Sequence, residues 1–250
     1  MATKIELEAG VSGVVVSINL ESYLASTLEL AIALAIASRC GLHGLFVEDV
    51  DLLSAASLPF TREVSLLSAQ PQALDYQQML TSFNARSRLF RRSLVHQAEQ
   101  SSLLWSYHTA RGRKHHTALE HSTGAEYLVI GESEKSPARK LRSRRIMVIK
   151  NNNHRLWQAL DVVLNEFRDN PVEVIMVSSA QQAEAEVERQ VVEKLSSHPH
   201  SRMVEIDRAE LEIALTTQAL IIDCLISCRH EAQIIEQIIR HNKCSAIVVA

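Results

Sequence analysis

VSGVVVSINLESYLASTLELAIALA, residues 11–35, sets a pattern that the rest of the chain follows. Val11–Ile18 is a short, β-branched apolar run, which predicts a buried strand. Asn19 follows and can cap a helix, and Glu21 would favour the positive end of the helix dipole. Residues 22–39 are apolar almost all round, as in a helix that lies between a sheet and other helices. The stretch predicts a buried strand that leads through a polar turn into a buried helix.

The same pattern occurs a second time. RIMVIKNNNHRLWQALDVVLNEF, residues 145–167, repeats the strand, the polar turn and the helix in the same order. TALEHSTGAEYLVIG, residues 117–131, is matched by LEIALTTQALIID, residues 211–223, each predicting a short helix and then a strand. Similarity at this period indicates that a β/α unit has been duplicated.

Strands and helices alternate along the remaining sequence. We expect further strands at residues 42–48, 103–110, 127–130, 172–178, 202–206, 219–224 and 245–249. We expect further helices at residues 72–100, 114–122, 181–196, 209–216 and 231–241, and one short helix within the connector 49–75. This alternation predicts an α/β fold with parallel sheets and helices on both faces. In such sheets ligands bind beyond the carboxyl ends of the strands, where the strand order reverses.

Composition narrows the class of protein. The chain has 250 residues, 46% of them hydrophobic, with only seven glycines and five prolines, which excludes collagen-like and disordered classes. Four cysteines in a chain of this length are no disulfide framework, and the spacing Cys224-x3-Cys228 fits neither a redox motif nor a zinc site. We expect reduced, buried thiols.

Nothing in the sequence predicts export or a membrane span. The opening MATKIELEAG has acidic residues where a signal peptide would be apolar. The most apolar run, Leu24–Ala37, is interrupted by Glu29 and is shorter than the roughly 20 residues that a span needs. We expect a cytoplasmic protein that does not contact a membrane.

Charge is distributed unevenly. The net charge is −3, but residues 80–150 carry +9 while residues 1–79 and 151–250 carry −6 each. Two basic clusters stand out, at residues 111–116 and 139–145. Either the basic segment forms a surface that faces an anion, or it lies against the acidic segments in the fold. We expect no nucleic-acid partner, because no aromatic stacking platform is interleaved with the basic residues.

Four stretches resemble one known family. They are the first strand with its turn and helix (14–28), GLHGLFVED (41–49), AEYLVIG (125–131) and RHNKCSAIVVA (240–250), the last similar to the RHAPCPVLVV ending common in that family. Together they resemble the universal stress protein family in tandem form, over nearly the whole chain. The resemblance implies an α/β fold of two tandem universal-stress-protein-like units with parallel sheets flanked by helices. The first unit would span residues 1–143, with a long inserted helix, and the second 144–250. Such units would pack as an internal pseudo-dimer, with a homodimer as a further option.

The chain departs from the family at the nucleotide site. Nucleotide-binding members carry a G-x2-G-x9-G-[ST] loop after the fourth strand, whose backbone amides close on phosphates. Here GESEKSPARKLRS, residues 131–143, keeps only Gly131. The family's acidic residue after the first strand is replaced by Ser17-Ile18-Asn19 in the first unit and by Lys150-Asn151-Asn152 in the second. About 13 residues separate Gly131 from Arg145, too few for a fifth strand in the first unit, so another part of the fold must complete that sheet edge, the second unit being one option.

If the protein has a ligand site, we place it in the first unit, at the ends of the first and fourth strands. Gly131 would let the backbone approach an anion, ATP or another phosphate-bearing molecule. Cationic side chains would replace the lost amides, and neutral groups would replace the family's acid. The predicted binding residues are Asn19, Gly131, Ser133, Arg139, Lys140 and Arg142. The alternative is that residues 139–145 form a solvated basic helix, and the second unit is expected to be purely structural, with substitutions at Arg229 and His230 leaving ligand binding unchanged.

No catalytic or metal-binding motif is evident. There is no G-x-S-x-G turn and no cysteine–histidine pair in a recognisable setting. His115, His116, His121, His198 and His200 lack the spacing of a helical metal site. The leading hypothesis is therefore a non-enzymatic, universal-stress-type protein of stress response or regulation, with an unidentified protein partner. The alternative is an ATP-binding protein that hydrolyses ATP slowly.

Overall fold

A computed structural model describes most of the chain. The described residues are 12–22, 24–58, 61–64, 71–73, 75–131, 144–151, 153–178, 189, 192–193, 195–196, 198, 201–217, 221–242 and 244–250. No described helix is both long enough and apolar enough to cross a membrane.

Strands and helices alternate through the first unit, as expected. Its strands are β1 (Gly13–Ile18), β2 (Gly41–Asp49), β3 (Arg62–Val64), β4 (Pro71–Ala73), β5 (Trp105–Gly112) and β6 (Tyr127–Ile130). Its helices are α1 (Leu24–Ser38), α2 (Val50–Ser57), α3 (Tyr76–Gln100) and α4 (Lys114–His121).

The second unit repeats this alternation. Its strands are β7 (Arg144–Ile149), β8 (Val172–Val177), β9 (Ser201–Ile206), β10 (Cys224–Cys228) and β11 (Ser245–Val249). Its helices are α5 (His154–Glu166), α7 (Arg208–Thr216) and α8 (Ala232–Asn242), with the 3-10 turn η2 (Arg229–Glu231) before α8.

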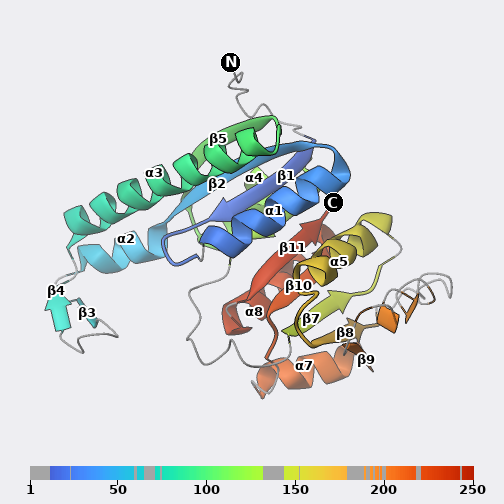
Figure 1. Ribbon diagram of the computed structural model, residues 1–250. Coiled ribbons are helices and arrows are strands. Elements are labelled where there is room, and N and C mark those ends of the chain that lie inside the picture. Colours follow the sequence, from blue (N-terminus) through green and yellow to red (C-terminus); the bar gives the residue numbers. More distant parts are fainter. Residues whose placement is uncertain are drawn as a thin grey trace.

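The strands of both units form one nine-stranded sheet (Figure 1), in the order β5-β2-β1-β6-β11-β10-β7-β8-β9. Within each unit all neighbouring strands of this sheet are parallel. The two units meet where β6 and β11 pair antiparallel, with Ile130 opposite Ala246 and Tyr127 opposite Val249. The last strand of the second unit thus completes the sheet edge that the first unit leaves open, which confirms that option. The predicted fold class, α/β with parallel sheets flanked by helices, is confirmed as well.

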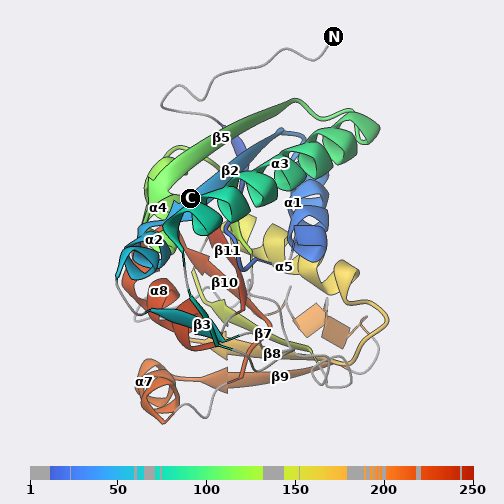
Figure 2. The same ribbon diagram turned by 90° about the vertical axis from the view of Figure 1, so that its left-hand side faces the viewer.

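Helices cover both faces of the sheet (Figure 2). Alternate strand residues point to opposite faces, so Val14 and Val16 pack under α1, α3 and α5, whereas Val15 belongs to the core beneath α4, α7 and α8. Because the units run antiparallel, the carboxyl ends of the first unit's strands lie at the same edge of the sheet as the amino ends of the second unit's strands.

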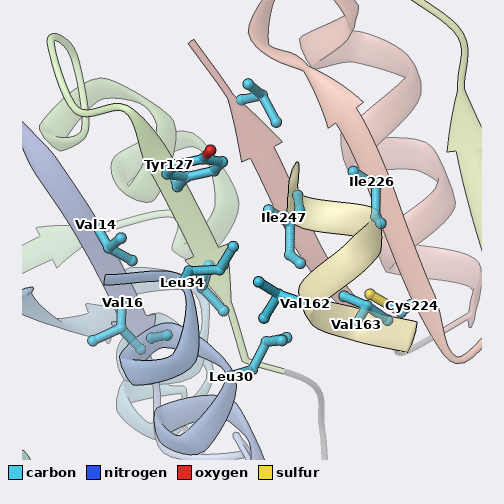
Figure 3. Packing of buried hydrophobic residues seen from close by; sticks show 14 of the residues in the cluster. Val14, Val16, Leu30, Leu34, Tyr127, Val162, Val163, Cys224, Ile226 and Ile247 are labelled. Carbon is cyan, nitrogen blue, oxygen red and sulfur yellow. The ribbon is translucent and has the colours of Figure 1, made fainter. Parts of the chain in front are cut away.

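One hydrophobic core spans the junction of the units (Figure 3). Leu30 and Leu34 of α1 lie on the side of Val162 of α5, Val163 lies beside Cys224 of β10, and the Ile247 side chain on β11 belongs to the same core. Leu34, Val163 and Ile247 are fully buried. Burying a side chain of this size contributes about 1.5–3 kcal/mol, so the junction is a substantial part of the folding free energy.

Polar contacts also join the two units at this junction. The Tyr127 hydroxyl donates to Gln158 Oε1 at 2.9 Å, and Gln158 Nε2 donates to the carbonyl of Ala37 at 3.1 Å. Gln158 on α5 therefore forms hydrogen bonds with Tyr127 on β6 and with the last turn of α1. These bonds satisfy the phenol at the edge of an otherwise apolar core.

Two predictions about single elements were wrong, and one small element was not anticipated. The strand expected at 219–224 is instead Cys224–Cys228, because the Asp223 carboxylate accepts from the backbone of Arg145 and lies 3.7 Å from the Arg144 guanidinium, which fixes Asp223 just before the strand. The long helix begins at Tyr76 rather than 72, since the Asp75 side chain caps it by accepting from Gln78. The small hairpin of β3 and β4 was not anticipated; it stands apart from the main sheet (Figure 1).

Candidate functional site

The strand order of the first unit reverses between β1 and β6. From β1 the chain passes through α1 to β2 on one side, and it reaches β6 on the other side from β5 through α4. The helices of these two connections, α1 and α4, cover opposite faces of the sheet, and the reversal point lies beyond the carboxyl ends of β1 and β6. In open α/β sheets this is the place where ligands bind. Asn19 and Gly131, two of the predicted site residues, lie there directly after the two strands.

Asn19 forms a tight turn with Ser22. The Asn19 side-chain oxygen accepts from the backbone N–H of Glu21 at 2.9 Å and from the Ser22 hydroxyl at 3.0 Å, and the Asn19 backbone N–H donates to Ser22 Oγ at 3.1 Å. The helix begins only at Leu24, so Asn19 shapes the turn before α1 rather than capping that helix directly. Asn19 is 9% exposed, and among the described residues none accepts from its Nδ2.

Ser22 connects this turn to Gly131. Its hydroxyl lies 3.5 Å from the Gly131 carbonyl, and the Gly131 N–H donates to the carbonyl of Ser17 at 3.0 Å. A Cβ on Gly131 would lie 2.9 Å from both Ser22 Cβ and Ile18 Cδ1. The absence of a side chain at Gly131 therefore lets β1 and β6 close over Ser22. This packing role accounts for the glycine without a ligand, and backbone contact with an anion at Gly131 stays a prediction.

Arg86 brings a positive charge to the same corner. Its guanidinium donates from α3 to the carbonyl of Ser22, and its Nε is buried with no acceptor among the described residues. Arg86 was not among the predicted site residues. Its spacing from the buried Phe83 and Phe90 could have identified it, because positions three and four apart share one side of a helix.

The other predicted site residues, Ser133, Arg139, Lys140 and Arg142, lie outside the described residues. Their part in the site stays a prediction.

Acidic residues neutralise the basic cluster at the end of β5. Arg111 Nη2 lies 2.7 Å from Glu48, Lys114 Nζ lies 3.0 Å from Glu21, and Arg113 lies 3.8 Å from Asp51. The pairing with Glu48 raises the pKa of Arg111. For these three residues the interpretation in which the basic segment lies against acidic ones is correct.

His115 belongs to the same cluster and lies on α4, where it is 6% exposed and its Nδ1 has no partner among the described residues. Burial, with Lys114 and Arg240 nearby, lowers the pKa of His115 to about 4. The imidazole is therefore neutral at physiological pH, and it adds no positive charge to a binding site there.

The equivalent corner of the second unit has different chemistry. Lys150 follows β7 as Asn19 follows β1, and its buried ammonium lies 2.6 Å from the Glu205 carboxylate. This pairing, together with a hydrogen bond from Ser178 to the same oxygen, lowers the pKa of Glu205. The cation at this corner is thus already neutralised by its own unit.

Arg229 follows β10, as Gly131 follows β6, and has a structural role. Its guanidinium donates to the carbonyl of Leu119 at 2.6 Å and to the carbonyl and hydroxyl of Ser122 at 2.7 and 3.0 Å. It therefore binds carbonyls at the end of α4 in the other unit. Arg229 is unsuitable as a neutral control position for ligand studies, because its replacement would loosen the contact between the units.

His43 and Ser106 are residue types that occur in catalytic dyads, but here both are buried in the core. His43 Nδ1 lies 2.8 Å from the Ser106 hydroxyl. Both residues are at least 94% buried, near the amino ends of β2 and β5, at the edge of the sheet away from Asn19. Burial lowers the pKa of His43, and its Nε2 faces Gly13, where an added Cβ would lie 2.8 Å away. Little of either side chain is therefore exposed to a substrate. Within the described part of the chain, no three histidine, cysteine, aspartate or glutamate side chains are grouped to hold a metal ion.

Comparison with known proteins gives remote likenesses in structure and none in sequence. No protein-family model matches the chain, and no curated protein matches it in sequence. Among solved structures the chain is similar to a universal stress protein from Archaeoglobus fulgidus DSM 4304, with 10% sequence identity and a TM-score of 0.40 over 94% of this chain and 95% of that one. A TM-score of this size carries no functional conclusion, so the fold assignment rests on the strand order and pairing described above.

Proposed function

We infer that the protein is a non-enzymatic, universal-stress-type protein of stress response or regulation, whose first unit binds an anionic small molecule at the carboxyl ends of β1 and β6. The observation that carries the proposal is the Asn19 turn at the point where the strand order reverses. There the side-chain nitrogen of Asn19 has no acceptor among the described residues. The Arg86 guanidinium donates to the carbonyl of Ser22, and the hydroxyl of Ser22 donates to Asn19 Oδ1.

The chemistry of this corner favours an anion over a neutral ligand. Asn19 Nδ2 and the Arg86 guanidinium are donors, and Glu21, the carboxylate beside Asn19 in the sequence, is held by Lys114. A carboxylate in place of Asn19 would repel phosphate oxygens, whereas the neutral amide does not. Residues 139–142 follow Gly131 in the sequence and would supply further positive charge.

The setting of the polar groups supports a binding role rather than catalysis. The His43–Ser106 pair is sealed in the core, and Ser22 is committed to hydrogen bonds with Asn19 and Gly131. Burial raises the pKa of Cys228 to about 11, so this thiol is a poor nucleophile at neutral pH.

A thermal-shift titration tests the proposal with ATP, ADP, AMP and inorganic phosphate as probes. A ligand at 100 times its dissociation constant stabilises a protein by about 2.7 kcal/mol, which raises Tm by roughly 5–10 °C for a chain of this length. We expect at least one phosphate-bearing probe to give such a shift. The shift should fall sharply in the Asn19→Asp variant and in the triple variant Arg139→Ala, Lys140→Ala, Arg142→Ala.

The matched control is the triple variant Arg88→Ala, Arg91→Ala, Arg92→Ala. It removes the same charge from an exposed face of α3 and should respond as the parent does. A parental response in the Asn19 variant would place the ligand elsewhere. If none of the probes shifts Tm, the first unit does not bind an anion as proposed. Turnover of ATP by the parent would favour the alternative, a protein that hydrolyses ATP slowly.

A further inference from the structure

The outward face of α3 carries three arginines without an ion pair. Arg88, Arg91 and Arg92 are exposed, and none pairs with an acidic side chain in the part of the chain that the structure describes. Leu89, between them, is 47% exposed. We call these four residues the arginine face. It contrasts with the basic residues at the strand ends, such as Arg111 and Arg145, which have carboxylates at 2.7 Å.

The outward face of α7 has the opposite charge around a similar apolar side chain. Glu210 and Glu212 are exposed, and Ile213 is 62% exposed. Glu212 forms no ion pair with a described residue, while Glu210 accepts from the backbone of Asp207 in a capping box. We call Glu210, Glu212 and Ile213 the acidic face.

The two faces have matching patterns along their helices. On α3 an exposed alanine, Ala85, precedes the pair Arg88-Leu89 by three residues. On α7 the exposed Ala209 precedes the pair Glu212-Ile213 by three residues. Positions three and four apart share one side of a helix, so each face has a small residue that permits close approach, a central branched apolar side chain and a charge beside it.

The two faces cannot meet within one chain. The helix α3 packs on one face of the sheet, over β2 and β5, whereas α7 follows β9 and packs on the other face. These strands are at opposite ends of the strand order, and Figures 1 and 2 show the two helices far apart in both views. Contact between them requires two molecules.

We propose that the arginine face of one molecule docks on the acidic face of a second copy of this chain. The contact is heterologous, so each molecule keeps one free face of each kind and assembly proceeds head to tail. With only nine residues, α7 offers a contact about 14 Å long. This is smaller than a stable dimer interface, and the assembly therefore depends on protein concentration. Screening between exposed charges weakens it as salt rises.

Sedimentation equilibrium of the full chain over a range of protein concentrations tests the proposal. At low salt the weight-average mass should rise above 27.9 kDa with concentration and return toward it when salt is added. The triple variant Arg88→Glu, Arg91→Glu, Arg92→Glu should stay monomeric, and so should the Glu212→Arg variant. A mixture of the two variants should associate again, because each then offers a face complementary to one on the other.

Two further variants distinguish this contact from nonspecific hydrophobic association. Ile213→Ser should weaken the association, whereas Ile36→Ser, at a residue that is 53% exposed on α1, should leave it unchanged. A parent that stays at monomer mass at all concentrations, or two charge-reversed variants that do not associate when mixed, would overturn the proposal. Circular dichroism of each variant shows that it is folded.

Discussion

The guanidinium of Arg229, in the second unit, donates two hydrogen bonds to Ser122, at the end of α4 in the first unit. A third goes to the carbonyl of Leu119. Helix ends leave carbonyls without partners inside the helix. Here Ser122 Oγ and the Ala125 N–H bind two of them locally, and Arg229 adds further donors from the other unit. Arg229 thus adds a polar contact between the two units on the face of the sheet opposite α1 and α5.

Replacement of Arg229 by alanine should therefore destabilise the whole chain. The change removes the charge-assisted hydrogen bonds to Leu119 and Ser122, and we expect a loss of about 2–4 kcal/mol in the free energy of unfolding. Arg229→Lys should recover little, because a lysine cannot bind three acceptors through a planar fork. Urea unfolding measures the loss. Arg240→Ala, which removes an exposed pair with Glu236 one helical turn away, is the control and should cost under about 0.5 kcal/mol.

Gly131→Ala should destabilise the fold because its Cβ would lie 2.9 Å from Ser22 Cβ. Overpacking of this kind costs about 1–3 kcal/mol. The Ser22→Gly change removes the opposing atom, so the double variant should lose less than the sum of the single losses. Additive losses in the double-mutant cycle would show that the close approach to Ser22 is not what destabilises the Gly131→Ala variant.

The two units should unfold together. Each contains one of the chain's two tryptophans, Trp105 in the first and Trp157 in the second. In Trp105→Phe and Trp157→Phe variants the remaining tryptophan reports on a single unit. We expect the fluorescence transitions to coincide with that of circular dichroism, because the core of Leu34, Val163 and Ile247 is shared. Leu34→Ala, expected to cost about 2–5 kcal/mol, should shift both transitions equally. Separate transitions would mean that the junction is weak.

Stability should decline as the pH falls below about 6.5. Burial keeps the His115 pKa at about 4, so the unfolded chain binds a proton that the folded chain does not. The stabilisation is complete above pH 6.5 and is lost as the pH falls toward 4, by about 3 kcal/mol in all. The pKa of His43 is lowered in the same direction. Denaturation at several pH values should show a smaller slope for His115→Gln than for the parent between pH 4 and 6.5.

Much of the fold could be predicted from the sequence because it depends on local patterns. The β-branched run before Asn19 and its repeat before Lys150 predicted the first strand of each unit, and the shortage of residues after Gly131 indicated a missing strand. The strand at Cys224–Cys228 was misplaced because ALIID is equally apolar, and only the tertiary contacts of Asp223 decide between them. The roles of Arg86 and Arg229 depend on carbonyls 64 and 107 to 110 positions away, which no local pattern encodes.

The site at the ends of β1 and β6 is tested most directly by nuclear magnetic resonance of the isotope-labelled chain, titrated with ATP and with inorganic phosphate. The account predicts progressive shifts of the Asn19 side-chain amide and of the Ser22 and Gly131 backbone amides, with smaller changes at Lys150 and Arg229 in the second unit. Shifts confined to the second unit or to the arginine face, or no shifts with either probe, would contradict it.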